Sequence, residues 1–131
     1  NVLNEIERVS KTTECTVTFD GLLSGEDYIR FIQSCDIGLS TQNPTGAYND
    51  TSFPSKILSY MANGLRVVSV KIPVIETSAI GEYMYYYDEQ TTKKIAEAIK
   101  SAAIDGAYNS RAEILKLNEK FISELKNLLG D

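Results

Sequence analysis

Three polar residues, Ser52, Ser55 and Lys56, stand around a proline in a pattern that could hold a phosphate group. Pro54 is expected in the first turn of a helix and Gly64 just past its end, the usual positions of these two residue types. A first helical turn has free backbone N–H groups and a partial positive charge, so it is a ready site for a diphosphate. Lys56 adds a full charge that a bound anion would neutralise, although a solvated surface lysine is the alternative interpretation.

The elements around this turn alternate between strands and helices. Hydrophobic patterns predict strands at 16–19, 36–40, 65–70 and 83–87. Helices are predicted from Ser24 to about Cys35, after Pro54, after Thr91 or Thr92, and from about Ser110 to Leu129. Such alternation implies a parallel sheet with right-handed crossovers. We expect a single α/β domain over residues 1–131, a Rossmann-like three-layer sandwich with about four parallel strands between helices and a C-terminal helix at 110–131.

Ligands of open parallel sheets bind beyond the carboxyl ends of the strands. Three stretches are expected there, namely 20–24, 41–53 and 71–77. The middle stretch leads directly into the helix that begins near Pro54. It is therefore the most promising place for a ligand.

Composition excludes several function classes. The formal net charge of −5 argues against non-specific nucleic-acid binding, which needs a basic face. The chain has no histidine, so it cannot contain a Ser-His-Asp or Cys-His nucleophile system. Two cysteines, Cys15 and Cys35, without histidine make a structural zinc site unexpected and are typical of reduced thiols in the cytoplasm. No apolar run approaches the roughly 20 residues that span a bilayer. The absence of an initiator Met before a helical pattern suggests a piece of a larger protein.

The run from Phe53 to Val68 resembles the donor-binding motif of retaining GT-B glycosyltransferases. That motif typically reads Pro-Ser-Lys, two apolar residues, Glu, Tyr, and later Gly and Val-Val, and Pro54, Tyr60 and Gly64 match it in this chain. Two further pieces align in order. Residues 17–21 look like the family strand that ends in Gly before the donor site, and residues 35–40 look like the next strand. The resemblance covers roughly residues 14–105 and is carried by the three pieces together.

The resemblance implies two Rossmann-like domains with the active site between them, the C-terminal one binding a UDP-, GDP- or ADP-sugar. Carried over by position, Gly21 and Leu22 would lie near the base, and Ser59 would hold the ribose. Thr51, Ser52, Ser55 and Lys56 would approach the diphosphate. The nucleotide-sugar is the substrate, so no cofactor and no metal are expected. The implied partners are the N-terminal acceptor domain and the nucleotide-sugar. A homodimer of the fragment and peripheral association of the parent with the inner face of the membrane remain open alternatives.

The sequence departs from the family at two acidic positions. Active members carry two glutamates separated by seven intervening residues, one near the sugar and one on the ribose hydroxyls. These positions are Thr51 and Ser59 here. Because a carboxylate makes stronger, charge-assisted hydrogen bonds, we expect weakened donor binding unless Glu76 or Asp50 substitutes from a neighbouring loop. The upstream Arg and Lys that neutralise the diphosphate in the family are also absent, so we expect no turnover by this chain alone.

Three interpretations of function follow. The first is a portion of a glycosyltransferase that moves a hexose from a nucleotide-sugar to a glycan or lipid-linked acceptor. The second is a non-catalytic nucleotide-sugar-binding or regulatory module that has lost the acidic residues. The third, a sugar epimerase of similar architecture, would need acid/base groups that the chain does not show. The tyrosines at 83 and 85–87 are interpreted as a half-buried strand rather than a sugar-stacking platform.

Overall fold

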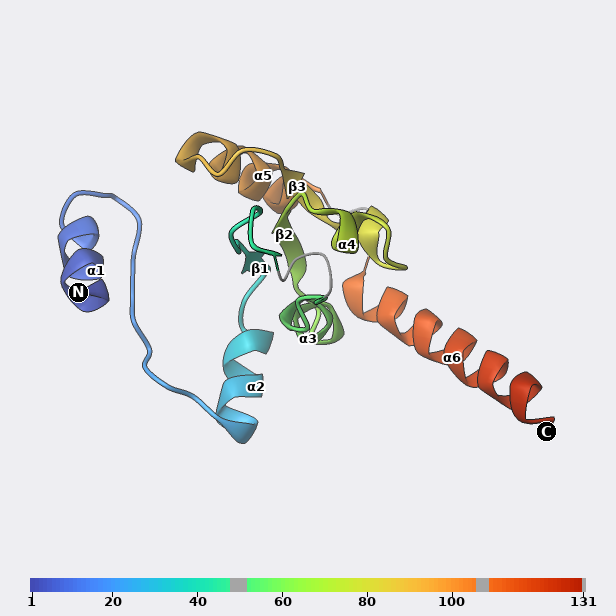
Figure 1. Ribbon diagram of the computed structural model, residues 1–131. Coiled ribbons are helices and arrows are strands. Elements are labelled where there is room, and N and C mark those ends of the chain that lie inside the picture. Colours follow the sequence, from blue (N-terminus) through green and yellow to red (C-terminus); the bar gives the residue numbers. More distant parts are fainter. Residues whose placement is uncertain (48–51, 106–108, 131) are drawn as a thin grey trace.

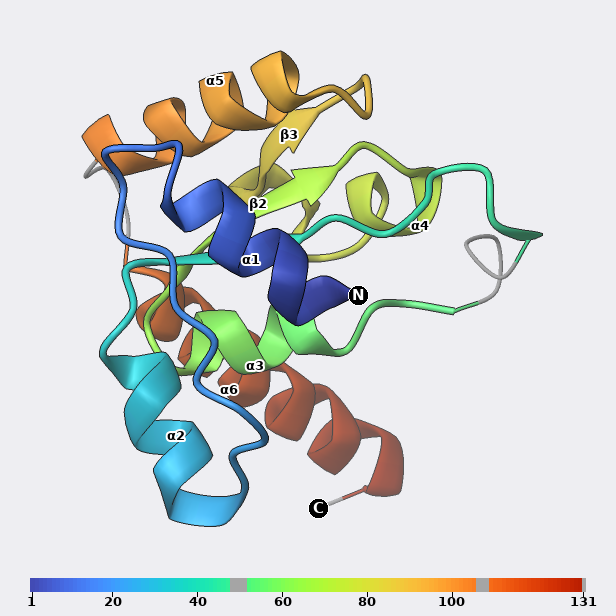
Figure 2. The same ribbon diagram turned by 90° about the vertical axis from the view of Figure 1, so that its left-hand side faces the viewer.

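The computed structural model describes residues 1–47, 52–105 and 109–130. Within them lies a parallel sheet of three strands in the order β1-β2-β3, where β1 is Ile37–Ser40, β2 is Arg66–Val70 and β3 is Tyr85–Tyr87. The central strand sets the register, with Leu39 opposite Val68 and Val68 opposite Tyr85. Helices cover both faces of the sheet (Figures 1 and 2). The predicted α/β three-layer sandwich is confirmed, with three strands in the described residues instead of about four.

The helices divide between the two faces. Helix α5 (Thr92–Ile104) contacts all three strands from one face, while α3 (Lys56–Ala62) packs on β1 and β2 and against α6 (Ser110–Leu129). The short helix α4 (Pro73–Glu76) follows β2 and precedes the 3-10 turn η2 (Gly81–Tyr83). Figure 2 shows α5 above the sheet and α3 below it.

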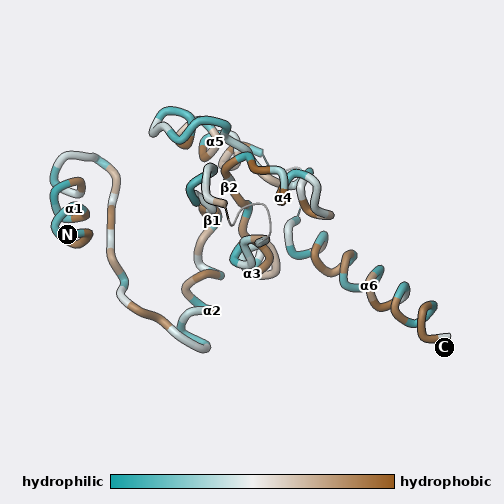
Figure 3. The backbone as a smooth tube through the Cα atoms, viewed as in Figure 1, coloured by the Kyte–Doolittle hydropathy of each residue, from teal (hydrophilic) through white to brown (hydrophobic). Residues whose placement is uncertain are grey.

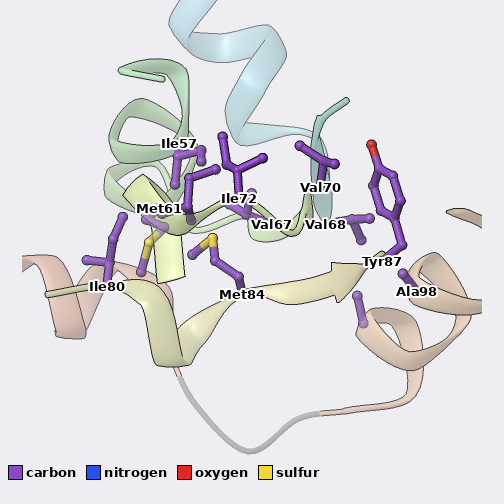
Figure 4. Packing of buried hydrophobic residues seen from close by; sticks show 12 residues of the cluster. Ile57, Met61, Val67, Val68, Val70, Ile72, Ile80, Met84, Tyr87 and Ala98 are labelled. Atoms are coloured by element: carbon purple, nitrogen blue, oxygen red, sulfur yellow. The ribbon is translucent and has the colours of Figure 1, made fainter. Parts of the chain in front are cut away.

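The core fills the space between α3, β2 and α5. Its fully buried side chains include Ile57 and Met61 from α3 and Val67 and Val68 from β2, with Tyr87 at the end of β3 (Figure 4). Strand β2 alternates in side-chain direction, yet four of its five residues are buried. A central parallel strand is covered on both faces, which explains its nearly continuous apolar sequence.

The turn after α3 connects this helix to β2 in a defined conformation. Gly64 has a φ of +91°, a left-handed conformation that favours glycine. The N–H of Leu65 donates to the carbonyl of Tyr60 at 3.0 Å, and the N–H of Gly64 donates to the carbonyl of Met61 at 3.0 Å. This pair of bonds is a Schellman motif, which satisfies the last carbonyls of the helix.

Two predictions about local structure are corrected. Residues 16–19 are extended but belong to no strand, because their main-chain groups find no neighbouring strand among the described residues. They join α1 (Val2–Ser10) to α2 (Gly25–Gln33) and lie apart from the sheet in Figure 1. Pro54 precedes α3 instead of lying in its first turn, because the helix begins at Lys56 with Ser55 as its N-cap.

Candidate carboxyl-edge site

The carboxyl ends of the three strands form one edge of the molecule. Thr41, Lys71 and Asp88 follow β1, β2 and β3 directly. The side-chain amide of Gln90 donates to the carbonyl of Thr41 at 3.1 Å, which ties the segment after β3 to the segment after β1. Figure 2 shows the chain after β1 and the helix α4 on this same side. Of the three stretches predicted at this edge, 41–53 and 71–77 follow strands of the sheet.

The residues predicted to contact a phosphate lie at or next to the start of α3. Ser52, Ser55 and Lys56 are exposed, and Ser59 is half-buried one turn further along the helix. The hydroxyl of Ser55 makes no capping hydrogen bond to α3. The four residues therefore lie on consecutive parts of one segment, with three of them accessible to a ligand.

A buried hydroxyl lies at the end of β1. Ser40 is fully buried, and its Oγ has no hydrogen-bond partner within the described part of the chain. The neighbouring buried Ser69 on β2 donates its Oγ to the carbonyl of Val70 at 3.1 Å. An unsatisfied buried hydroxyl carries a cost of about 1–3 kcal/mol, so Ser40 marks a polar position that the apolar core does not explain.

A polar hollow of about 330 Å³ opens beside β3 and α5 at this edge. Its lining includes Lys71 and Asp88 after the strands, and Lys94 and Glu97 on α5. The Nζ of Lys71 lies 3.7 Å from an Oε of Glu76, so one of its two lysines already has a carboxylate neighbour. The hollow thus mixes both signs of charge. Sequence reasoning missed Asp88 and Lys94, although the position of Asp88 directly after a strand was a usable signal.

The predicted base-binding residues lie elsewhere. Gly21 has a φ of +76° and Leu22 is 100% exposed, and both belong to the extended segment before α2. Since residues 16–19 form no strand of the sheet, the turn that follows them is not at the carboxyl edge (Figures 1 and 2). The structure therefore does not bring Gly21 and Leu22 together with the start of α3.

Of the two acidic residues predicted to replace the lost glutamates, Glu76 is a described residue and Asp50 is not. Glu76 lies at the end of α4, at the carboxyl edge, with Lys71 as its ionic neighbour. Thr51 and Asp50 lie outside the described residues. The ribose position, Ser59, remains a serine on a described helix, with its carbonyl accepting from the side-chain amide of Asn63 at 2.8 Å.

Three tyrosines of β3 and the preceding turn donate their hydroxyls to other parts of the fold. The hydroxyl of Tyr83 donates to Glu113 of α6 at 2.9 Å, that of Tyr85 donates to Asp105 at 2.8 Å, and that of Tyr86 donates to the carbonyl of Gly81 at 2.7 Å. The bond to Glu113 raises the pKa of Tyr83 to about 12, and burial raises the pKa of Tyr86 to about 12. These hydroxyls join β3 and the turn before it to neighbouring segments, which supports a structural role over a sugar-stacking platform.

Residues 1–47, 52–105 and 109–130 contain no group of three or more Cys, Asp or Glu side chains placed to hold a metal ion. None of the helices formed by these residues is both long and apolar enough to cross a membrane.

Comparisons with known proteins add no relative. The chain matches no family model, no curated protein and no solved structure.

Proposed function

We propose that this chain is the nucleotide-sugar-binding portion of a retaining GT-B glycosyltransferase that transfers a hexose to a glycan or lipid-linked acceptor. One observation carries the proposal. The motif-like run from Phe53 to Val68 forms a helix at the carboxyl edge, a glycine turn and the buried central strand, in that order. Ligands of open α/β sheets bind at this edge.

The proposed contacts follow from the position of each residue in that run. Ser52, Ser55 and Lys56 would bind the diphosphate through hydroxyls and one ammonium group, and Thr51 would lie next to them. Ser59 would face the ribose. In the family, the leaving diphosphate of the reaction is stabilised electrostatically. Gly21 and Leu22 would reach the base only if the segment before α2 were repositioned.

Part of that repositioning is expected from the family's strand order. There, two upstream strands lie between the strand that resembles residues 16–19 and the strand that resembles β1. The proposal therefore accounts for the separation of residues 16–19 from the sheet. A parent protein carrying those strands and the acceptor domain would work in the cytoplasm, with association to the inner face of the membrane as an open alternative.

The alternative function is a non-catalytic nucleotide-sugar-binding or regulatory module. It is favoured by one observation: the positions of both family glutamates read Thr51 and Ser59. A serine hydroxyl is too short to bind both ribose hydroxyls. Loss of a charged hydrogen bond weakens binding by about 1–3 kcal/mol, so the wild-type chain would bind the donor weakly.

Restoring the two carboxylates tests the proposal. Isothermal titration calorimetry of the Thr51→Glu/Ser59→Glu variant with UDP- and GDP-sugars should show affinity for one donor raised by about tenfold or more over wild type. The control, Thr92→Glu/Ser123→Glu, adds the same charge at exposed positions of α5 and α6 and should leave affinity unchanged. No binding by either the wild type or the restored variant would exclude donor binding by this chain.

A further inference from the structure

The free edge of β1 lies beside an apolar groove. Within residues 1–47, 52–105 and 109–130, the strand order is β1-β2-β3, so β1 has a strand neighbour on one side only. The bond from Arg66 N–H to the Asp36 carbonyl, with Ile37 opposite Arg66, sets the alternation of this ladder. The main-chain groups of Ile37 and Leu39 therefore point away from β2. A groove of about 230 Å³ runs along this edge, lined by residues that include Tyr28 and Phe31 of α2.

The same chain carries a strand-like segment that pairs with no strand among the described residues. Residues 16–19, Thr-Val-Thr-Phe, alternate polar and apolar residues and are rich in β-branched types. Among the described residues, the main-chain groups of 16–23 make no main-chain hydrogen bond. Phe19 is 61% exposed, and Figure 3 shows hydrophobic residues along this segment, away from the rest of the molecule. An exposed strand-like segment and an open edge are each prone to pairing.

We propose that residues 16–19 of one copy of this chain add as a parallel fourth strand to β1 of a second copy, and reciprocally. In each copy, residues 16–19 lie away from that copy's own β1 (Figure 1). Each copy therefore has both an unpaired segment and an unpaired strand edge. Exchange of an identical element between two copies is a low-cost route to a dimer with two-fold symmetry. The inference concerns this chain alone and does not rest on the proposed glycosyltransferase function, because in a GT-B parent an upstream strand would pair with this edge of β1.

The apolar pattern selects one register. Leu39 lies in a row with Val68 and Tyr85 on the α5 face of the sheet, and its side chain is 41% exposed. Placing Phe19 opposite Leu39 continues this row and covers Leu39, and it sets Val17 opposite Ile37. Threonines then face the α3 side, where the ring of Tyr60 covers Gly38 so closely that a Cβ there would overlap it. A shift of this register by one residue would turn Val17 and Phe19 to the α3 side of the sheet and leave Leu39 uncovered.

This register brings two native cysteines together. Cys15 and Cys35 stand immediately before the paired segments, two residues before Val17 and Ile37 respectively. Neighbouring strands are about 4.8 Å apart, and disulfides join Cα atoms that are roughly 4.4–6.8 Å apart. Although Cys35 lies in the turn that ends α2, where its N–H donates to the carbonyl of Ile32 at 2.9 Å, the pairing would bring Cys15 of one copy close to Cys35 of the other. Both are free thiols, Cys15 exposed and Cys35 half-buried.

The experiment uses the native thiols and one pair of variants. Light scattering across a concentration series should show a dimer, and mild oxidation should trap Cys15–Cys35 bridges between two chains, seen on non-reducing gels and by peptide mass spectrometry. In the selected register, the N–H of Thr18 donates to β1. Thr18→Pro removes that donor and should abolish both the dimer and the bridge, while Thr18→Ala keeps it and should behave as wild type.

Three outcomes would overturn the inference. The first is a monomer at every concentration. The second is a Cys15–Cys35 bridge within one chain, which would mean that the segment closes on its own β1. The third is a dimer that persists in Thr18→Pro or that yields no Cys15–Cys35 bridge. Because residue 18 is exposed and outside the sheet, neither variant should unfold the core.

Discussion

At the scale of single residues, the hydrogen bond from Tyr83 to Glu113 joins the turn before β3 to the first turns of α6. The two oxygen atoms lie 2.9 Å apart. Hydrogen bonds from Lys116 and Tyr83 lower the pKa of Glu113, and the bond to Glu113 raises the pKa of Tyr83 to about 12. The bond therefore needs a charged carboxylate and a protonated phenol at once.

This requirement predicts a pH-dependent effect of Tyr83→Phe. The lowered pKa of Glu113 means that its contribution is present above the ordinary value of 4.5 and is lost as the pH falls through the folded-state pKa. The raised pKa of Tyr83 means that its contribution is present below the ordinary value of 10.0 and is lost as the pH rises toward about 12. The urea midpoint of Tyr83→Phe should therefore be lower than that of wild type near neutral pH, and the difference should shrink at both extremes.

Urea unfolding of both proteins from acid to alkaline pH measures this difference. Glu113→Gln serves as the control, because it removes the titrating carboxylate and keeps an acceptor for Tyr83. A difference in urea midpoint between wild type and Tyr83→Phe that stays the same at every pH would contradict the role given to this hydrogen bond.

At the scale of elements, the turn at Gly64 connects the end of α3 to the start of β2. The side-chain amide of Asn63 adds a bond to the Ser59 carbonyl at 2.8 Å, and Gly64 itself has a φ of +91°. A Cβ at this position would meet no other atom within 4 Å, so only the backbone conformation opposes a side chain there.

Gly64→Ala should therefore destabilise the protein by about 1–2 kcal/mol, the cost of a left-handed conformation for an L-residue. Gly64→Asn should cost less, because asparagine tolerates this conformation best among the other residues. Urea unfolding gives both values. An alanine variant as stable as wild type would show that the turn can adopt another conformation.

At the scale of the whole molecule, α6 is packed at its start and exposed at its end. Ile114 and Leu117 pack against the core, whereas Phe121 is 61% exposed and Leu128 is 82% exposed. Figure 1 shows the second half of α6 extending away from the sheet, and Figure 3 shows hydrophobic residues along it. The sequence predicted one helix from about Ser110 to Leu129, and the structure divides its length into a packed part and an exposed part.

This division predicts unequal effects of two alanine substitutions on one helix. Leu117→Ala should lower the free energy of unfolding by about 1–2 kcal/mol, below the range for fully buried leucines because the site is partly exposed. Phe121→Ala should change it by less than about 0.5 kcal/mol, as surface substitutions do. Thermal or urea unfolding compares them directly. Equal losses of unfolding free energy in the two variants would mean that the end of α6 is covered in solution.

Much of the fold was predictable because it depends on local pattern. Neighbouring residues alone define the apolar run at 65–70, the glycine after α3, and the helical patterns after Thr91 and from Ser110. Parallel pairing then followed from the alternation of strands and helices. The start of α3 at the carboxyl edge, with Ser52, Ser55 and Lys56, was predictable for the same reason.

Other features depended on contacts between distant residues. Residues 16–19 have the composition of a strand, but a strand also needs a neighbour to accept its hydrogen bonds, and no sequence pattern supplies one. Gly21 and Leu22 consequently lie away from the edge where a strand would have placed them. The polar hollow formed by Lys71, Asp88, Lys94 and Glu97 joins two strand ends to one helix across the sheet. The sequence by itself determined which segments form helices and buried strands, because periodicity and turn residues act over a few positions. Only the tertiary structure decided which edges stay open and which side chains meet, because those depend on distant main-chain groups being paired.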